Sequence, residues 1–137
     1  MQVMPVYNLI LYVFILALQH NKYYIGLTDR PDIDVPEYFC GNANVWTQMH
    51  KPERIINITR VDNPFLVDGY TKQYMAQYGL ENVRGGSYDS YILTDMERVH
   101  LGREFKYYRD LVKEMEQYEI NKLSKEICLK KIENMIY

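Results

Sequence analysis

Carboxylates are the chemistry-bearing side chains that this sequence concentrates most closely. Four of them fall within nine residues, and they are Asp29, Asp32, Asp34 and Glu37. Carboxylate oxygens are the ligands that hard cations such as Mg²⁺ prefer. A cluster of them is a poor environment for a phosphate group, because like charges repel. The sequence offers neither a serine nucleophile motif nor a phosphate-binding glycine loop to set beside them.

The histidines and cysteines are too scattered to form a metal-ligand motif. His20, His50 and His100 are well separated, so we interpret each as a surface or packing residue. Cys40 and Cys128 stand alone, without a CxxC pair or a nearby histidine. The sequence therefore predicts no zinc site and favours a reducing, intracellular compartment.

Length and charge limit the function classes. A chain of 137 residues is the size of one domain with a single core. Its formal net charge of −2 does not predict tight non-specific DNA binding, since counterion release by basic side chains drives such binding. The apolar stretch 6–18 is interrupted by Asn8 and is too short to span a bilayer. We expect it to form a strand buried on both faces and expect no membrane association.

Hydrophobic periodicity predicts a small sheet followed by helices. The expected strands span residues 9–18, 23–27 and 54–61, and the first two form a hairpin. Gly26 in the second strand allows another group to approach the backbone closely. Residues 28–45 are expected to be a loop with at most a turn or two of helix, because Pro36 follows Pro31 so soon.

The second half of the chain is predicted to be mostly helical. One helix is expected at 64–78, ending at Gly79, and a turn-rich connection at 81–87. Helix resumes near Tyr91, and the tail beyond residue 102 carries apolar residues at spacings of three and four. Asn121 or Ser124 is expected to cap a break between two tail helices. Core packing, as a helical hairpin, or self-association would bury their apolar stripe.

These elements predict an α+β fold. We expect a three-stranded antiparallel sheet flanked by helices in residues 1–90. A helical extension, packed on that domain or used for self-association, is expected at 91–137.

The hairpin carries a resemblance to a known family. Tyr12 stands in the first strand and Tyr24-Ile25-Gly26 in the second, at a separation typical of the GIY-YIG endonucleases. Residues 43–52, which include Trp46-Thr47 and Pro52, are similar to an element of structure-specific members. Residues 70–88 resemble a block found in GIY-YIG-like proteins of large DNA viruses. The chain thus resembles that family from about residue 9 to residue 88, which implies a viral origin and a host-cell location.

The resemblance implies a specific chemistry. In this family a helix glutamate holds one divalent metal ion, Mg²⁺ or Mn²⁺, and the two strand tyrosines position or activate the attacking water. Tyr12 and Tyr24 match the tyrosines. The metal-ligand position falls on Val67 or on Asp68: Asp68 would leave a shorter carboxylate, whereas Val67 would mean that the site is lost.

The family's arginine is not matched. Two independent residue counts, from Gly26 and from Trp46, place that position at Asp34, and a histidine often seen four residues later falls on Tyr38. Arg30 is the nearest basic residue, one helical turn too early. A carboxylate in place of a guanidinium puts negative charge against a negative transition state.

Two later residues are further candidates. Asn82 matches the family's late asparagine, although turn chemistry alone also explains it. Arg84 precedes Gly85-Gly86 and is a second candidate source of a guanidinium, although this pair mainly predicts a tight turn.

We therefore hypothesise a GIY-YIG-like pseudoenzyme that binds a protein or nucleic-acid partner and self-associates through its C-terminal helices. The alternative is an active metal-dependent DNA endonuclease with a rearranged site, using Tyr12, Tyr24, Asp68 and either Arg30 or Arg84. A third reading is a small α+β protein in which the Tyr-Ile-Gly tripeptide is coincidental.

Overall fold

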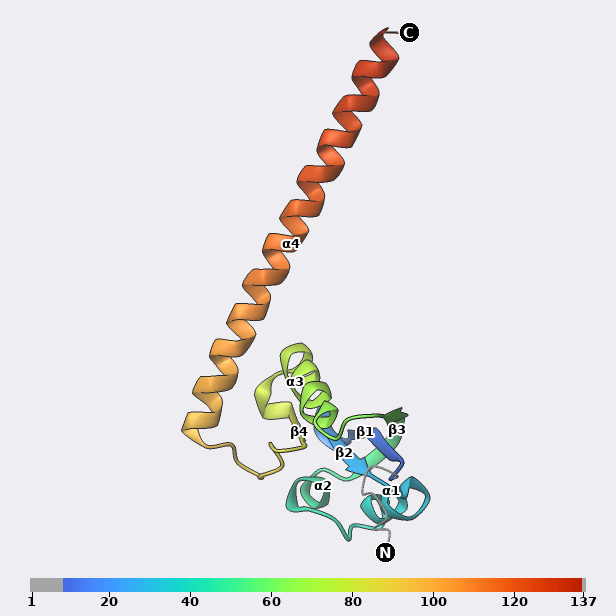
Figure 1. Ribbon diagram of the computed structural model, residues 1–137. Coiled ribbons are helices and arrows are strands. Elements are labelled where there is room, and N and C mark those ends of the chain that lie inside the picture. The colour runs from blue at the N-terminus through green and yellow to red at the C-terminus, as the bar shows by residue number, and fades with distance from the viewer. Residues whose placement is uncertain (1–8, 137) are drawn as a thin grey trace, which may run out of the picture. The chain divides into compact units, whose positions relative to one another are not determined.

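The computed structural model of the chain describes residues 9–136, without the side chains of residues 108, 112 and 132–136. The first three residues of the apolar stretch 6–18 lie outside the described residues. The protein is α+β, with helices flanking a four-stranded sheet and a long C-terminal helix (Figure 1). The chain divides into two compact units, residues 1–95 and 96–137.

The predicted hairpin forms the centre of the sheet. Strand β1, Leu11–Leu18, pairs antiparallel with β2, Lys22–Thr28, and with β3, Pro52–Val61. Residues 13–16 are all buried, so β1 is covered on both faces as its unbroken apolar run predicts. A single 3₁₀ turn, Gln19–Asn21, connects β1 to β2.

A fourth strand corrects the predicted three-stranded sheet. Residues Val83–Gly85, expected to lie in a turn, form β4, which pairs parallel with β2. The strand order is β3-β1-β2-β4, so the sheet is mixed rather than antiparallel. Gly85 permits this pairing because a Cβ there would overlap the backbone oxygen of Ile25. Gly85 therefore allows the close pairing of β4 with β2 as well as the turn.

A helix occupies the segment predicted to be mainly loop. Helix α1, Pro31–Phe39, continues through Pro36. That proline removes only one hydrogen-bond donor, and the Pro36 carbonyl still accepts from the Cys40 amide at 3.0 Å. Val35, 2% exposed, anchors the helix in the core. Helix α2, Val45–Met49, follows and is capped by the side chain of Asn44, which accepts from the Thr47 amide.

Helices α1 and α2 lie on one face of the sheet, and the next helix along the chain lies on the other (Figure 1). Helix α3, Leu66–Tyr78, confirms the predicted helix and ends at Gly79, followed by the 3₁₀ turn Leu80–Asn82. Its Tyr74 and Tyr78 rings pack against Tyr23 of β2. Tyr24, the next residue, points to the other face and joins a core cluster with residues of α1 and α2.

Helix α4, Asp95–Ile136, is one uninterrupted helix of 42 residues. The expected helix start near Tyr91 is wrong by four residues, and the expected break at Asn121 or Ser124 is absent. No glycine or proline follows Gly102. Asn121 accepts a hydrogen bond from Gln117 one turn earlier, at 3.0 Å, instead of capping a new helix. Within the described residues, no helix is long and apolar enough to cross a membrane.

Candidate functional site

The face of the sheet that carries Tyr24 holds most of the predicted site. Residues that pair directly across antiparallel strands share a face, and β1 and β2 pair Tyr12 with Thr28 and Leu16 with Tyr24. Both tyrosines therefore face α1. Their backbones lie about 13 Å apart along the strand direction, because Thr28 is four residues beyond Tyr24. The hairpin brings the two tyrosines to one face without placing them side by side.

Tyr24 forms a pair with Tyr38 of α1, the residue at the expected histidine position. The Tyr38 hydroxyl donates to the Tyr24 hydroxyl at 3.3 Å, and the rings lie 5.1 Å apart. Burial, the neighbouring Tyr38 and the Asp89 carboxylate raise the pKa of Tyr24 far above its usual value, although a hydrogen bond with the Asn44 side chain opposes this. Tyr24 therefore remains a neutral phenol at physiological pH.

Asp34 is fixed at the end of the same face. Its Oδ2 accepts a hydrogen bond from the Thr28 hydroxyl at 2.6 Å, and its Oδ1 lies 3.3 Å from Nε of Arg30. Thr28 Oγ1 also accepts from the Arg30 backbone amide at 3.0 Å. Burial raises the pKa of Tyr38, and the carboxylates of Asp34 and Asp89 raise it further, although the hydrogen bond with Tyr24 opposes this. The hydroxyl pair thus faces two negative charges.

The space over Gly26 is filled by the protein's own core. Phe14 pairs with Gly26 across the hairpin, and a Cβ at Gly26 would overlap the Phe14 ring. That ring also lies 5.2 Å from Tyr38 and 6.1 Å from Tyr24, centroid to centroid. The close approach that Gly26 permits is therefore made by Phe14, whose role the sequence did not reveal.

Val67 and Asp68, the two candidates for the metal-ligand position, lie in α3 on the opposite side of the sheet from Tyr24. Val67 is buried. Both oxygens of Asp68 accept hydrogen bonds from Ser87, one from its amide and one from its hydroxyl, each at 2.7 Å. A divalent cation would have to displace both donors. Among the described residues, no three His, Cys, Asp or Glu side chains gather to hold a metal ion. The donor set around Asp68 therefore does not fit a preformed Mg²⁺ or Mn²⁺ site.

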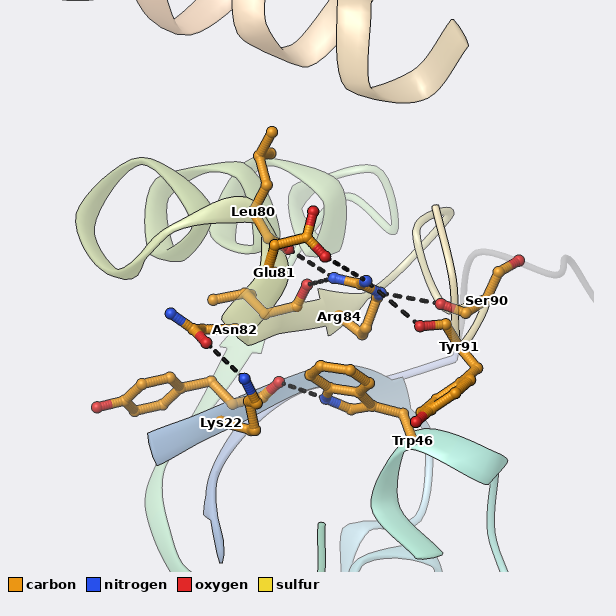
Figure 2. A network of polar contacts seen from close by, with 10 residues as sticks. Lys22, Trp46, Leu80, Glu81, Asn82, Arg84, Ser90 and Tyr91 are labelled. Atoms are coloured by element: carbon orange, nitrogen blue, oxygen red, sulfur yellow. Dashed lines mark hydrogen bonds and ion pairs between the residues drawn. The ribbon is translucent and has the colours of Figure 1, made fainter. Parts of the chain in front are cut away.

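Arg84 is enclosed in the fold (Figure 2). Its side chain is almost fully buried, and its guanidinium carbon lies 4.5 Å from the centre of the Trp46 ring. Its nitrogens donate to four backbone carbonyls between 2.6 and 3.3 Å, those of Leu80, Val83, Ser90 and Tyr91. Arg84 thus holds together the loops around β4 and is not available to a phosphate.

Trp46 and Asn82 also form hydrogen bonds that connect elements of the fold (Figure 2). The Trp46 indole donates to the carbonyl of Tyr23 at 3.0 Å, which attaches α2 to β2. Asn82 accepts from the Lys22 ammonium and donates to the Tyr78 carbonyl, both at 2.7 Å. Asn82 thereby closes the C-terminus of α3 and connects it to the start of β2.

No family model, curated protein or solved structure matches this chain. What the site is able to do therefore follows from its own geometry. Tyr24, Tyr38 and Asp34 offer two hydroxyls and a carboxylate, and the negative charge of Asp89 acts on both tyrosines. Arg30, whose side chain is 62% exposed, supplies the nearby positive charge and pairs with Asp34.

Two features of the site were missed by sequence reasoning. Asp89 lies outside every recognisable motif, and only the fold brings its charge to Tyr24. His20 and His50, interpreted as separate surface residues, meet with their Nδ1 atoms 2.9 Å apart. The separation of thirty residues between the two histidines gives no periodic signal, and Asp89 belongs to no motif. Neither feature was therefore detectable in the sequence.

Proposed function

We propose that this chain is a GIY-YIG-like domain that does not hydrolyse phosphodiesters and acts as a binding module. The position of Asp34 carries the proposal. This carboxylate stands where the resemblance expects a guanidinium, and its hydrogen bond to Thr28 fixes it there.

The electrostatics of the site support a loss of catalysis. Removing one preorganised donor to a developing oxyanion costs about 10²–10³ in rate, and reversing its charge costs more. Asp34 and Asp89 both act on the tyrosine hydroxyl pair. Because Tyr24 is held as a neutral phenol, it is poorly suited to remove a proton from water.

The remaining cations do not replace the missing one. Arg84 is engaged by backbone carbonyls on every side. Arg30 is exposed enough to leave Asp34, and this single observation favours the alternative of an active endonuclease. In that case Arg30 would supply the positive charge, whereas Asp68, on the opposite side of the sheet and bonded to Ser87, would not complete that site.

The partner of the binding module is a protein or a nucleic acid. Helix α4 is the surface that we assign to it, because this helix exposes many large apolar side chains among its described residues. They include Met115, Tyr118, Ile120, Leu123 and Ile127. Self-association through this helix is one form of such binding.

A cleavage assay tests the proposal. The full chain is incubated with branched and linear DNA in Mg²⁺ or Mn²⁺, beside an Asp34→Arg variant. We expect no cleavage by the wild type, whereas gain of cleavage in the variant would show that the scaffold is intact. Wild-type cleavage that Tyr24→Phe abolishes would overturn the proposal.

A further inference from the structure

Strand β3 forms one edge of the sheet. It is the outermost strand in the order β3-β1-β2-β4 and, at ten residues, the longest. In the described part of the chain, no other segment forms backbone hydrogen bonds with its outer side. A long edge strand of this kind is a template for pairing with another strand.

Two isoleucines make this edge apolar on one face. Ile55 and Ile58 are 45% and 40% exposed. They pair with Leu16 and Phe14 of β1, so both lie on the face that carries Tyr24, although they are three residues apart. The β-bulge between them, where β3 has one extra residue, produces this arrangement.

The strand is complementary to itself. If two copies of β3 run antiparallel about a two-fold axis between Ile56 and Asn57, Ile55 of one copy lies opposite Ile58 of the other. In the same register Glu53 lies opposite Arg60, and each of these pairs occurs twice. Residues that lie opposite each other in paired strands point to the same face of the sheet. In a regular strand, two residues that are three apart, such as Ile55 and Ile58, would point to opposite faces. The bulge at Ile56 makes it possible for Ile55 and Ile58 to share a face, and the self-complementarity rests on this apolar pair. Glu53 is the extra residue of a second register shift, so Glu53 and Arg60 add opposite charges at the two ends of the ladder.

We propose that β3 is a homodimer interface, in which two copies of the chain join edge to edge through this register. The four-stranded sheets then form one continuous sheet of eight strands. The occupant is a second copy because both apolar contacts and both ion pairs arise from one strand meeting itself. Opposed apolar pairs and opposite charges across strands each stabilise such a ladder.

This inference does not depend on the proposed loss of catalysis, nor on association through α4. A dimer formed by β3 has its own readout, an oligomeric state that changes with the charges at residues 53 and 60, which distinguishes it from DNA cleavage and from association through α4. The two proposals can therefore fail separately.

Sedimentation equilibrium of the full chain measures the dimer directly. We expect a monomer–dimer equilibrium that Arg60→Glu weakens about tenfold or more, because it places Glu53 opposite a second carboxylate. Glu53→Arg weakens it similarly, whereas the double exchange Glu53→Arg with Arg60→Glu restores it. The matched control is the charge change Gln77→Glu at an exposed position of α3, which leaves the β3 dimer unchanged. Circular dichroism shows whether each variant is folded.

Disulfide crosslinking tests the register. With Cys40 and Cys128 replaced by serine, the double variant Ile55→Cys with Ile58→Cys should crosslink into a covalent dimer, because each new thiol faces its counterpart. Each single variant should not, since identical positions lie about 7 Å apart along the strands, and the spacing between strands takes them beyond disulfide reach. A chain that is monomeric at all concentrations would overturn the proposal. So would a dimer that charge reversal at residues 53 and 60 leaves unchanged, or crosslinking of the single variants alone.

Discussion

The hydroxyl of Thr28 donates a 2.6 Å hydrogen bond to Oδ2 of Asp34. Thr28 is the last residue of β2, and Asp34 lies in the first turn of α1. The bond therefore ties the helix to the strand that carries Tyr24. An acidic residue here therefore has a structural role.

The Thr28–Asp34 bond should contribute measurably to stability. Thr28→Val keeps the side-chain shape but removes the donor, and we expect it to lower the free energy of unfolding by about 1–2 kcal/mol. The cost should shrink when Asp34→Ala is already present, since the acceptor oxygens are then gone. Urea unfolding of the two single variants and the double variant measures this coupling. Full additivity would show that the bond contributes nothing.

Arg84 should be essential for folding rather than for binding phosphate. Arg84→Lys keeps the charge but cannot reach carbonyls on several sides, so we expect a loss of about 3 kcal/mol in stability. Arg30→Lys, at an exposed site, is the matched control and should change stability by less than about 0.5 kcal/mol. Equal thermal shifts in the two variants would contradict the enclosed position of Arg84.

Substitutions of Gly26 and Gly69 by alanine should have opposite effects on stability, because only Gly26 is in contact with another side chain, that of Phe14. Gly26→Ala drives a methyl group into the Phe14 ring, and we expect it to destabilise the domain by about 2 kcal/mol. Gly69→Ala, in α3 with open space around it, should stabilise it by about 0.5–1 kcal/mol. Phe14→Leu should relieve part of the Gly26→Ala cost. If Gly26→Ala is neutral on thermal unfolding, the ring does not fill this space.

His50 should make stability depend on pH. Burial, with the charges of His20, Lys22 and Arg84, lowers the pKa of His50 below its usual 6.5. The unfolded chain then binds more protons than the folded one as the pH falls through that value. Stability from this group is present above about pH 7 and is lost toward pH 5. The drop in melting temperature over this range should be smaller in His50→Asn than in the wild type. An identical drop would exclude His50 as its source.

The parts of the fold that the sequence predicted correctly are those with local signals. The hairpin and α3 follow from apolar periodicity and from Gly79 at the helix end. Strand β4 was missed because its three residues have no period, and only their pairing with β2 makes them a strand. Helix α1 was missed because Pro36 is a local break signal that the burial of Val35 overrides.

In the candidate site, too, the features with local sequence signals were predicted and those that depend on long-range contacts were not. The hairpin that carries Tyr12 and Tyr24 was predicted from local patterns, and the observed register places both on one sheet face. The enclosure of Arg84 was not predictable, because its carbonyl partners lie in loops that have no sequence pattern. The charge of Asp89 beside Tyr24 likewise depends on the path of the chain after β4. Long-range contacts of single residues therefore decide which candidates are available for chemistry.

Cleavage of a branched DNA by the purified full chain in Mn²⁺, over a range of protein concentrations, tests most directly whether this domain hydrolyses phosphodiesters. We expect no cleavage above that of a matched preparation of Tyr24→Phe. Cleavage by the wild type that rises with protein concentration and is absent in Tyr24→Phe would contradict it.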